Sequence, residues 1–286
     1  MMIVPAAAAK ESDAFWKSIV SSAYAAPAAT PLGPLLDELV DMAAAPDPVR
    51  RDETGYAIFA RWVHGETRLT VTDFARAHEK LDAMARKQLG EPEAASEAVF
   101  GRSFALLYLK ELVFVSQRIR YMDVPAHERT VALAVAALER ERDARGWISP
   151  NGWVHAFAHA ADLTRALARH PDTTREQLAR LHAALNARIE RAGSPFRWAE
   201  EVRAAGALNA IHVHPKADPV WFDRWLGNVA TQCKRVWSGA FDPAQYAGFR
   251  AVSQVLAATV AHDGARGVRM SAEQLERAKS TAQQCQ

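Results

Sequence analysis

The strongest constraint on the fold is the spacing of apolar residues, which recur every three or four positions along most of the 286-residue chain. This spacing places them on one face of an α-helix, whereas the alternation typical of a strand does not persist anywhere. Alanine, the best helix former, occurs 58 times, while glycine and proline, the poorest, occur 14 times each. The sequence therefore predicts an all-α protein.

The pattern divides into about twelve expected helices, separated by proline, glycine and capping residues. We expect helices near 12–25, 34–45, 47–64, 70–88, 95–120, 124–145, 150–170, 173–192, 198–213, 218–238, 242–263 and 271–283. Several residues are predicted to cap helix N-termini, either just before a proline or alone. They are Asp47, Ser149, Asp218, Asp242, Thr70, Thr173 (with Glu176 in a capping box) and Ser271.

Short connections between many helices predict stacked antiparallel helix pairs. A pair with its turns takes about 40 residues, the size of a HEAT or armadillo unit. The chain shows no clean internal repeat, so two architectures stay open: an irregular HEAT-like α/α solenoid and a closed α-toroid. We expect one domain over 12–286, with 191–198 as its clearest internal break. Residues 1–11 are either a disordered leader or the remnant of a signal peptide.

Charge and cysteine content limit the partners and leave the compartment open. Lys and Arg total 35 against 33 Asp and Glu, so no nucleic-acid partner is expected. The longest apolar stretch is too short to span a bilayer, which predicts a soluble protein without a transmembrane segment. Cys233 and Cys285 either pair, which favours an exported protein, or remain free thiols in the cytoplasm. Without a CxxC pair, a thiolate zinc site is excluded.

The densest group of reactive side chains lies between residues 139 and 162. On the expected helix, His155 and His159 are one turn apart, and Asp162 follows on the same side. These three are the candidate catalytic residues, a histidine acting as general base with Asp162 or Asp143 orienting it. The same three residues are the only metal ligands considered, but no metal or other cofactor is expected. A polar network buried between helices is the alternative.

Other polar and aromatic residues join this group as candidate ligand-binding residues. They are Glu53, Arg102, Asp143, Arg145, Trp147 and Trp153. Arg102 lies in an apolar helix, so it must either extend its charge to the surface or find a carboxylate, for which Glu53, Glu139 and Asp143 are the candidates. Two further patterns predict structure rather than function. Trp221 and Trp225 form an aromatic stripe typical of a core, and His212 with His214 marks the end of a helix.

Several separate motifs occur in the order found in a known family. They are FWK at 15–17, RDE at 51–53 followed by Tyr56, VFGRSF at 99–104, ERDARGW at 141–147 and GWVHAFAHAAD at 152–162. Over about 12–215 the chain resembles the bacterial DUF2785 family, a domain of unknown function. The resemblance implies an all-helical fold and no known reaction. Trp147-Ile148 replaces the more usual Tyr-Val, and the match is less clear after about residue 215.

Three functions remain open at this point. The favoured hypothesis is a polar pocket that binds a small polar or anionic ligand or a peptide segment, because many polar groups converge on otherwise apolar helices. The second is a hydrolase-like enzyme that uses His155, His159 and Asp162. The third is a protein-interaction scaffold, since solenoids present long concave surfaces. The oligomeric state stays undetermined.

Overall fold

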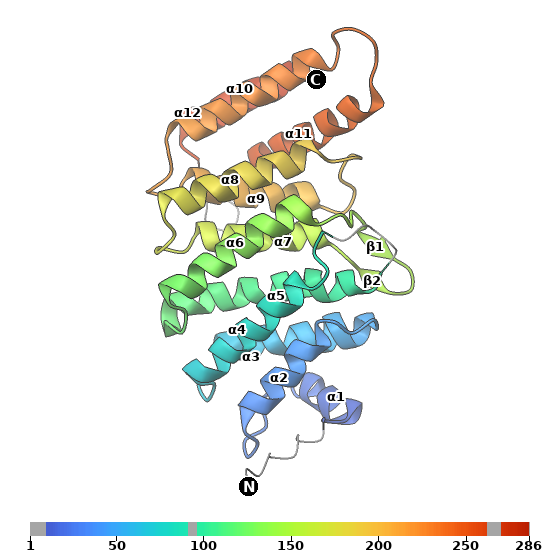
Figure 1. The fold of residues 1–286 in the computed structure, drawn as a ribbon, viewed down its shortest axis with the longest axis vertical. Helices are drawn as coiled ribbons and strands as arrows, with labels where there is room; N and C mark the ends of the chain where they lie inside the picture. Colours follow the sequence, from blue (N-terminus) through green and yellow to red (C-terminus); the bar gives the residue numbers. More distant parts are fainter. Residues whose placement is uncertain (1–9, 91–95, 262–269, 286) are drawn as a thin grey trace.

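The computed structural model describes residues 10–90, 96–261 and 270–285, and these ranges are mostly helical (Figure 1). The helices are α1 (Asp13–Ser21), α2 (Leu32–Met42), a π-helix η1 (Val49–Tyr56), α3 (Ala57–Gly65), α4 (Val71–Arg86), α5 (Ala98–Ile119), α6 (Val124–Arg140), α7 (Ala156–Ala168), α8 (Arg175–Glu190), α9 (Glu200–His212), α10 (Val220–Arg235), α11 (Pro243–Ala261) and α12 (Ala272–Gln284). The strands in these ranges are β1 (Trp147–Ile148) and β2 (Gly152–Trp153), which form one antiparallel hairpin. The all-α prediction is confirmed.

The helices pack as successive pairs in two layers. In one layer α3, α5, α7, α9 and α11 contact one another in turn, and in the other α2, α4, α6 and α8 do the same. Each even-numbered helix also packs on the odd-numbered helix that follows it. Helices α1 and α12 lie at opposite ends of the stack, so it is open rather than closed into a toroid (Figure 1). Residues 1–9 of the expected leader lie outside the described residues.

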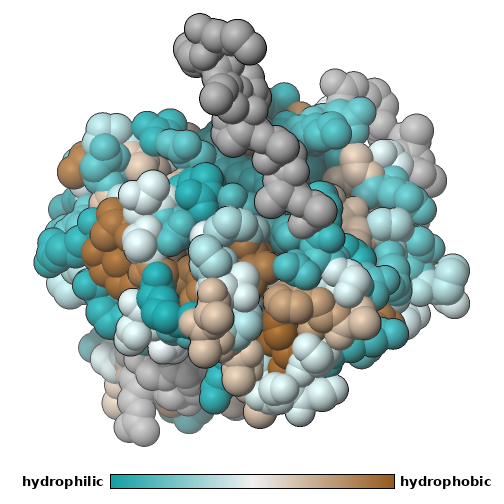
Figure 2. Space-filling model, turned by 90° about the horizontal axis from the view of Figure 1, so that it is seen from below, coloured by the Kyte–Doolittle hydropathy of each residue, from teal (hydrophilic) through white to brown (hydrophobic). Residues whose placement is uncertain are grey.

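Helix α5 forms the centre of the core. It is apolar on nearly all sides, and most of its residues are buried. A helix of that kind needs neighbours all round it, and α5 has them: α3 and α7 in its own layer and α4 in the other. The end of the stack nearest α1 carries hydrophobic patches interrupted by polar residues (Figure 2). None of the helices in the described ranges combines the length and apolar character that crossing a bilayer requires.

Most predicted helix starts are confirmed by their hydrogen bonds. Thr70 and Ser271 form capping boxes, and the carboxylates of Asp47, Asp218 and Asp242 each accept the N–H two residues further on. The predicted cap at Thr173 is wrong by one position. Thr174 caps α8 instead and forms its capping box with Gln177 rather than with Glu176.

The expected helices 124–145 and 150–170 are both too long. Helix α6 ends at Arg140, α7 begins only at Ala156, and the β-hairpin occupies part of the chain between them. Ser149-Pro150 therefore does not start a helix; it is a cis peptide bond in the turn of the hairpin. Gly152 has a φ of +83°, and a Cβ there would lie 2.8 Å from Pro48. Only glycine fits this close approach in a left-handed conformation.

One fully buried arginine ties the hairpin to the first half of the chain. Arg51, from η1, donates to the carbonyl oxygens of Ala45 at 3.0 Å and Asn151 at 2.8 Å. Its guanidinium also lies 4.3 Å from the centre of the Phe100 ring and 4.6 Å from that of Phe104. Segments a hundred residues apart are thus held together by a single side chain.

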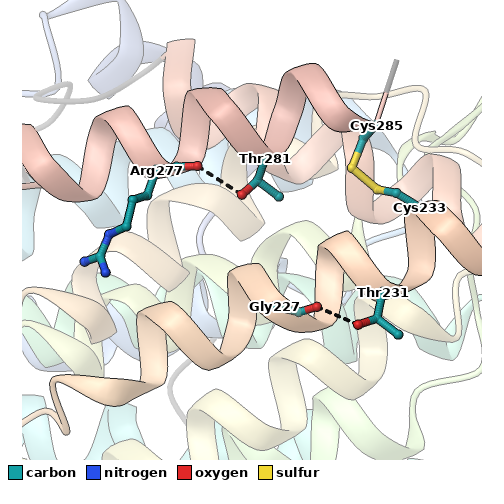
Figure 3. The surroundings of a disulfide bond; sticks show 6 residues. All are labelled: Gly227, Thr231, Cys233, Arg277, Thr281 and Cys285. Carbon is teal, nitrogen blue, oxygen red and sulfur yellow. Dashed lines mark hydrogen bonds between the residues drawn. A yellow bond between two sulfur atoms is a disulfide. The ribbon is translucent and has the colours of Figure 1, made fainter.

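A disulfide fixes the last helix. Cys233 in α10 and Cys285 at the end of α12 are bonded, with their Cα atoms 5.2 Å apart (Figure 3). Of the residues in α12, only Ala278 and Thr281 are buried. Helix α12 buries little apolar surface, so the covalent bond holds it against α10. The sequence had left this pairing open.

The second half of the stack has an aromatic core around two histidines. Trp221 and Trp225 are buried there, as their stripe predicted. His212 is buried as well, and its Nε2 lies 3.0 Å from Nε2 of His182. Burial holds the pKa of His212 well below its usual range. The prediction that His212 marks the end of a helix is confirmed, since α9 ends at this residue, but its ring faces the interior rather than the solvent.

Candidate functional site

A cavity of about 430 Å³ opens on one edge of the stack. Two chain connections border it, the α6–α7 connection with the hairpin and the α8–α9 connection, and both lie on the same edge (Figure 1). Its lining consists of residues 143–148, 155–157 and 192–198, together with Arg188 and Glu200. The cavity thus joins the predicted reactive segment to a loop that lies some forty residues further along the chain.

His155 forms part of the cavity wall at the start of α7. It is the N-cap residue in a left-handed conformation, with a φ of 49°. Its half-buried ring stacks on the indole of Trp153, with ring centres 4.2 Å apart and planes 23° apart. Its Nε2 is buried without a hydrogen-bond partner. Burial lowers the pKa of His155 and thereby favours the neutral ring, although the nearby carboxylate of Glu200 opposes this effect.

The N-terminus of α7 points at the same cavity. No side chain caps it, so its first N–H groups are without side-chain acceptors. Such groups and the helix dipole together favour an anion. The neighbouring helix α9 also begins at the cavity, but its first residue, Glu200, accepts hydrogen bonds from the backbone N–H groups of Arg197 and Trp198. Glu200 thereby fixes the loop that precedes α9.

Arg188 from α8 brings a positive charge to the cavity. Its guanidinium lies 5.0 Å from the centre of the Phe157 ring. Within the described ranges it makes no hydrogen bond or ion pair. Burial lowers its pKa, the charge of Arg191 adds to the effect, and the carboxylates of Glu141 and Glu200 oppose it. A half-buried guanidinium without a direct ion pair is costly, and a bound anion would reduce that cost.

The rim of the cavity is aromatic. Trp147 is 47% exposed and Trp198 is 42% exposed, although both rings contact neighbours. Trp198 lies across Gly146, where any Cβ would collide with the indole ring. The adjacent Asp143 and Arg145 form an ion pair with each other on the cavity wall. The rim therefore offers flat apolar surfaces beside the charges.

Two of the predicted catalytic residues lie in the interior instead. His159 is buried, its Nδ1 is 2.8 Å from the hydroxyl of Ser103, and burial holds its pKa well below the usual range. Asp162 is buried in an ion pair with Arg203. The rings of His155 and His159 remain neighbours, with centres 5.9 Å apart. In the described residues no three His, Cys, Asp or Glu side chains gather as metal ligands would.

Two of the predicted ligand-binding residues also lie away from the cavity. Arg102 forms a two-pronged ion pair with Glu141, at 2.8 and 3.1 Å, and not with any of the three partners predicted for it. Glu141 is available because α6 ends before it. Glu53 is an exposed residue of η1 and does not line the cavity. Asp143, Arg145 and Trp147 line it as expected, and Trp153 supports His155 from behind.

Sequence reasoning missed the residues that complete the cavity. Arg188 sits in an ordinary amphipathic helix, where one arginine among many carries no distinguishing signal. Phe157 was not singled out, and Trp198 belongs to a segment interpreted only as an internal break. A turn-rich segment with exposed aromatic residues is the one signal that was present, because binding residues concentrate on such loops.

Comparison with known proteins gives one match. A family model described as "Protein of unknown function (DUF2785)" matches residues 87–256, which is more than half of the chain and includes the whole cavity. The matched range begins later than the resemblance noted over about 12–215 and extends beyond it into α11. No curated protein and no solved structure matches the chain.

Proposed function

Because the chain belongs to the DUF2785 family, whose function is unknown, we propose a function from its own geometry: the edge cavity binds a small anionic ligand that carries a flat apolar part. The observation that carries this proposal is the unpaired guanidinium of Arg188 inside the cavity. Guanidinium groups bind carboxylates and phosphates through two parallel hydrogen bonds. A ligand of this charge would supply the direct ion pair that Arg188 lacks within the described residues.

The remaining cavity wall supports the same ligand class. The uncapped start of α7 favours negative charge beside Arg188. Trp147 and Trp198 provide flat apolar surface at the opening, where an aromatic or other planar group would stack. Neutral His155 provides a ring nitrogen for a hydrogen bond. A volume of about 430 Å³ is within the range of small-ligand sites.

A matched pair of probes tests this proposal. Isothermal titration should show that phenyl phosphate and indole-3-carboxylate bind more tightly than their neutral counterparts, phenol and indole-3-carboxamide. Arg188→Gln should weaken binding of the anions about tenfold, since one charged hydrogen-bonding partner is worth roughly 1.5–3 kcal/mol. Arg180→Gln, on the same helix but outside the cavity, is the control. Equal affinity for charged and neutral probes would refute the proposal.

An enzymatic role is the second candidate, and it rests on His155. This histidine is at the cavity, burial lowers its pKa, and its Nε2 has no hydrogen-bond partner among the described residues that would compete for a proton. His159, whose ring contacts that of His155, would act only as a positioning residue. Asp162 would act on His155 only from a distance, because it is already paired with Arg203. Loss of turnover of an aryl ester or phosphate in His155→Gln, with unchanged ligand affinity, would support this role.

We also propose that the two-layered stack is a HEAT-like solenoid and that a peptide segment is an alternative ligand for its edge. The disulfide supports an oxidising compartment, since such bonds rarely persist in the cytosol. Thiol labelling of the protein in intact cells tests this. Free Cys233 and Cys285 in that experiment would count against export.

A further inference from the structure

All the strongly exposed aromatic side chains of the described residues lie along one edge. They are Trp147, Trp198, Trp237 and Phe241. They belong to three successive connections, between α6 and α7, α8 and α9, and α10 and α11, which follow one another along the stack (Figure 1). Exposed rings are expected singly over a protein surface, so their alignment on one edge indicates a binding surface.

A second cavity continues the first along this edge. It has a volume of about 500 Å³ and lies between the end of α8, the end of α10 and the start of α11. Ala192 and Gly193 line both cavities, so the two share a wall made of one short stretch of chain. Beyond it Trp237 contacts Tyr246 and Phe249, and Phe249 lines the second cavity. The two cavities are therefore parts of one elongated groove.

Positive charges without partners accompany the groove. Arg191 and Arg235 line the second cavity and, like Arg188 in the first, form no ion pair in the part of the chain that the structure describes. Arg235 has only a long hydrogen bond to Gln245, at 3.4 Å. Arg188 and Arg191 are three residues apart on the same side of α8, and they repel each other. A ligand with several negative charges would relieve this repulsion.

We propose that the groove binds an acidic oligosaccharide, with one sugar unit in the first cavity and further units running past Ala192 and Gly193 to the second. This inference rests on the proposed function of the first cavity. Sugar rings present flat C–H faces that stack on exposed tryptophan, and uronic acid carboxylates fit arginine forks. A peptide fits less well, because the groove offers arginine forks and rings and has no long strand edge for main-chain pairing. Near-neutral charge argues against nucleic acid.

The test is the dependence of affinity on ligand length. Isothermal titration would compare galacturonic acid with its α-1,4-linked dimer and hexamer. We expect the hexamer to bind at least thirtyfold more tightly than the monomer. A site for one sugar unit would give only a sixfold gain, because a hexamer offers it six equivalent units. Neutral maltohexaose should bind at least tenfold more weakly than the acidic hexamer. The double variant Arg235→Gln/Trp237→Ala should lose most of the length gain while its affinity for the monomer stays within twofold.

Controls separate this inference from the proposed function. Arg224→Gln, on α10 outside both cavities, should leave all affinities unchanged. Arg188→Gln should weaken the monomer and the hexamer alike. Monomer binding without a length gain, or a gain that survives in the double variant, would overturn the elongated groove and leave the first cavity's proposal intact. An equal gain for hexaglutamate would overturn the saccharide in favour of an acidic peptide.

Discussion

Replacing Arg51 by methionine should destabilise the protein and release the hairpin beside the cavity. The guanidinium of Arg51 is fully buried and makes two hydrogen bonds of 3.0 Å or less to carbonyl oxygens, one of them in the hairpin. Its Nε also lies 2.8 Å from Oδ1 of Asp52. The two side chains form an ion pair, but these two atoms do not have the geometry of a hydrogen bond. Burial raises the pKa of Asp52 to about 6 although Arg51 opposes it.

The expected loss follows from these contacts. Each hydrogen bond of a charged group contributes roughly 1.5–3 kcal/mol. The two aromatic contacts add about 1 kcal/mol. Methionine offsets part of this loss, because burying its uncharged side chain carries no cost for removing a charge from water. We therefore expect a net loss of about 4 kcal/mol in the free energy of unfolding, within the range for broken buried ion pairs.

Urea unfolding followed by far-UV circular dichroism measures this loss. The control is Arg86→Met, which removes an exposed ion pair to Asp82 and should cost less than about 1 kcal/mol. Hydrogen exchange provides a second readout, because the amides of the hairpin should lose protection in the Arg51 variant before those of α5. A loss below about 1 kcal/mol, or unchanged protection of the hairpin, would refute the reasoning.

Three further predictions concern the cavity, the buried histidines and the disulfide. Gly146→Ala should displace Trp198 and weaken binding of indole-3-carboxylate at least tenfold, with an unchanged far-UV spectrum; equal affinity would contradict the described packing. Burial lowers the pKa of His78 to about 4, so the unfolded chain takes up a proton below about pH 6.5 and stability falls as the pH drops towards 4. The free energy of unfolding, measured by urea titration at each pH, should fall about 2 kcal/mol less between pH 7 and pH 5 in His78→Gln than in the unmodified protein. An equal fall in both proteins would contradict this assignment. Changing Cys233 and Cys285 to serine opens a loop with a sequence separation of 52, worth about 4 kcal/mol, and should leave α12 unprotected in hydrogen exchange while α5 stays protected.

Local patterns were sufficient for most of the fold. The apolar spacing predicted the helices, and short-range hydrogen bonds produced most of the predicted caps. Ser149-Pro150 shows where this reasoning ends, because it has the same local pattern as Asp47-Pro48. Distant groups act on this turn instead, since Arg51 donates to the Asn151 carbonyl in the same hairpin and Gly152 packs on Pro48. Tertiary contacts of that kind have no counterpart in a sequence window.

The candidate site was predicted in part for the same reason. His155, Asp143 and Trp147 are close in sequence, so their grouping was visible. Arg188 reaches the cavity only because α8 packs in the layer above α7 and the loop after it folds back. Conversely, sequence spacing placed His159 and Asp162 beside His155 on one helix face. In the structure His155 precedes α7 in a left-handed conformation and lines the cavity, whereas His159 and Asp162 face the interior.

The placement of the loops on one edge has a consequence for how this family can diversify. The interior is built by helices whose side chains are locked by their neighbours, whereas the cavities are bordered by three connections that contribute few core residues. On the proposed function, insertions and substitutions in these connections would alter ligand preference at little cost in stability. Relatives are therefore expected to share the stack and to differ in what they bind, and loop exchange between them should transfer specificity.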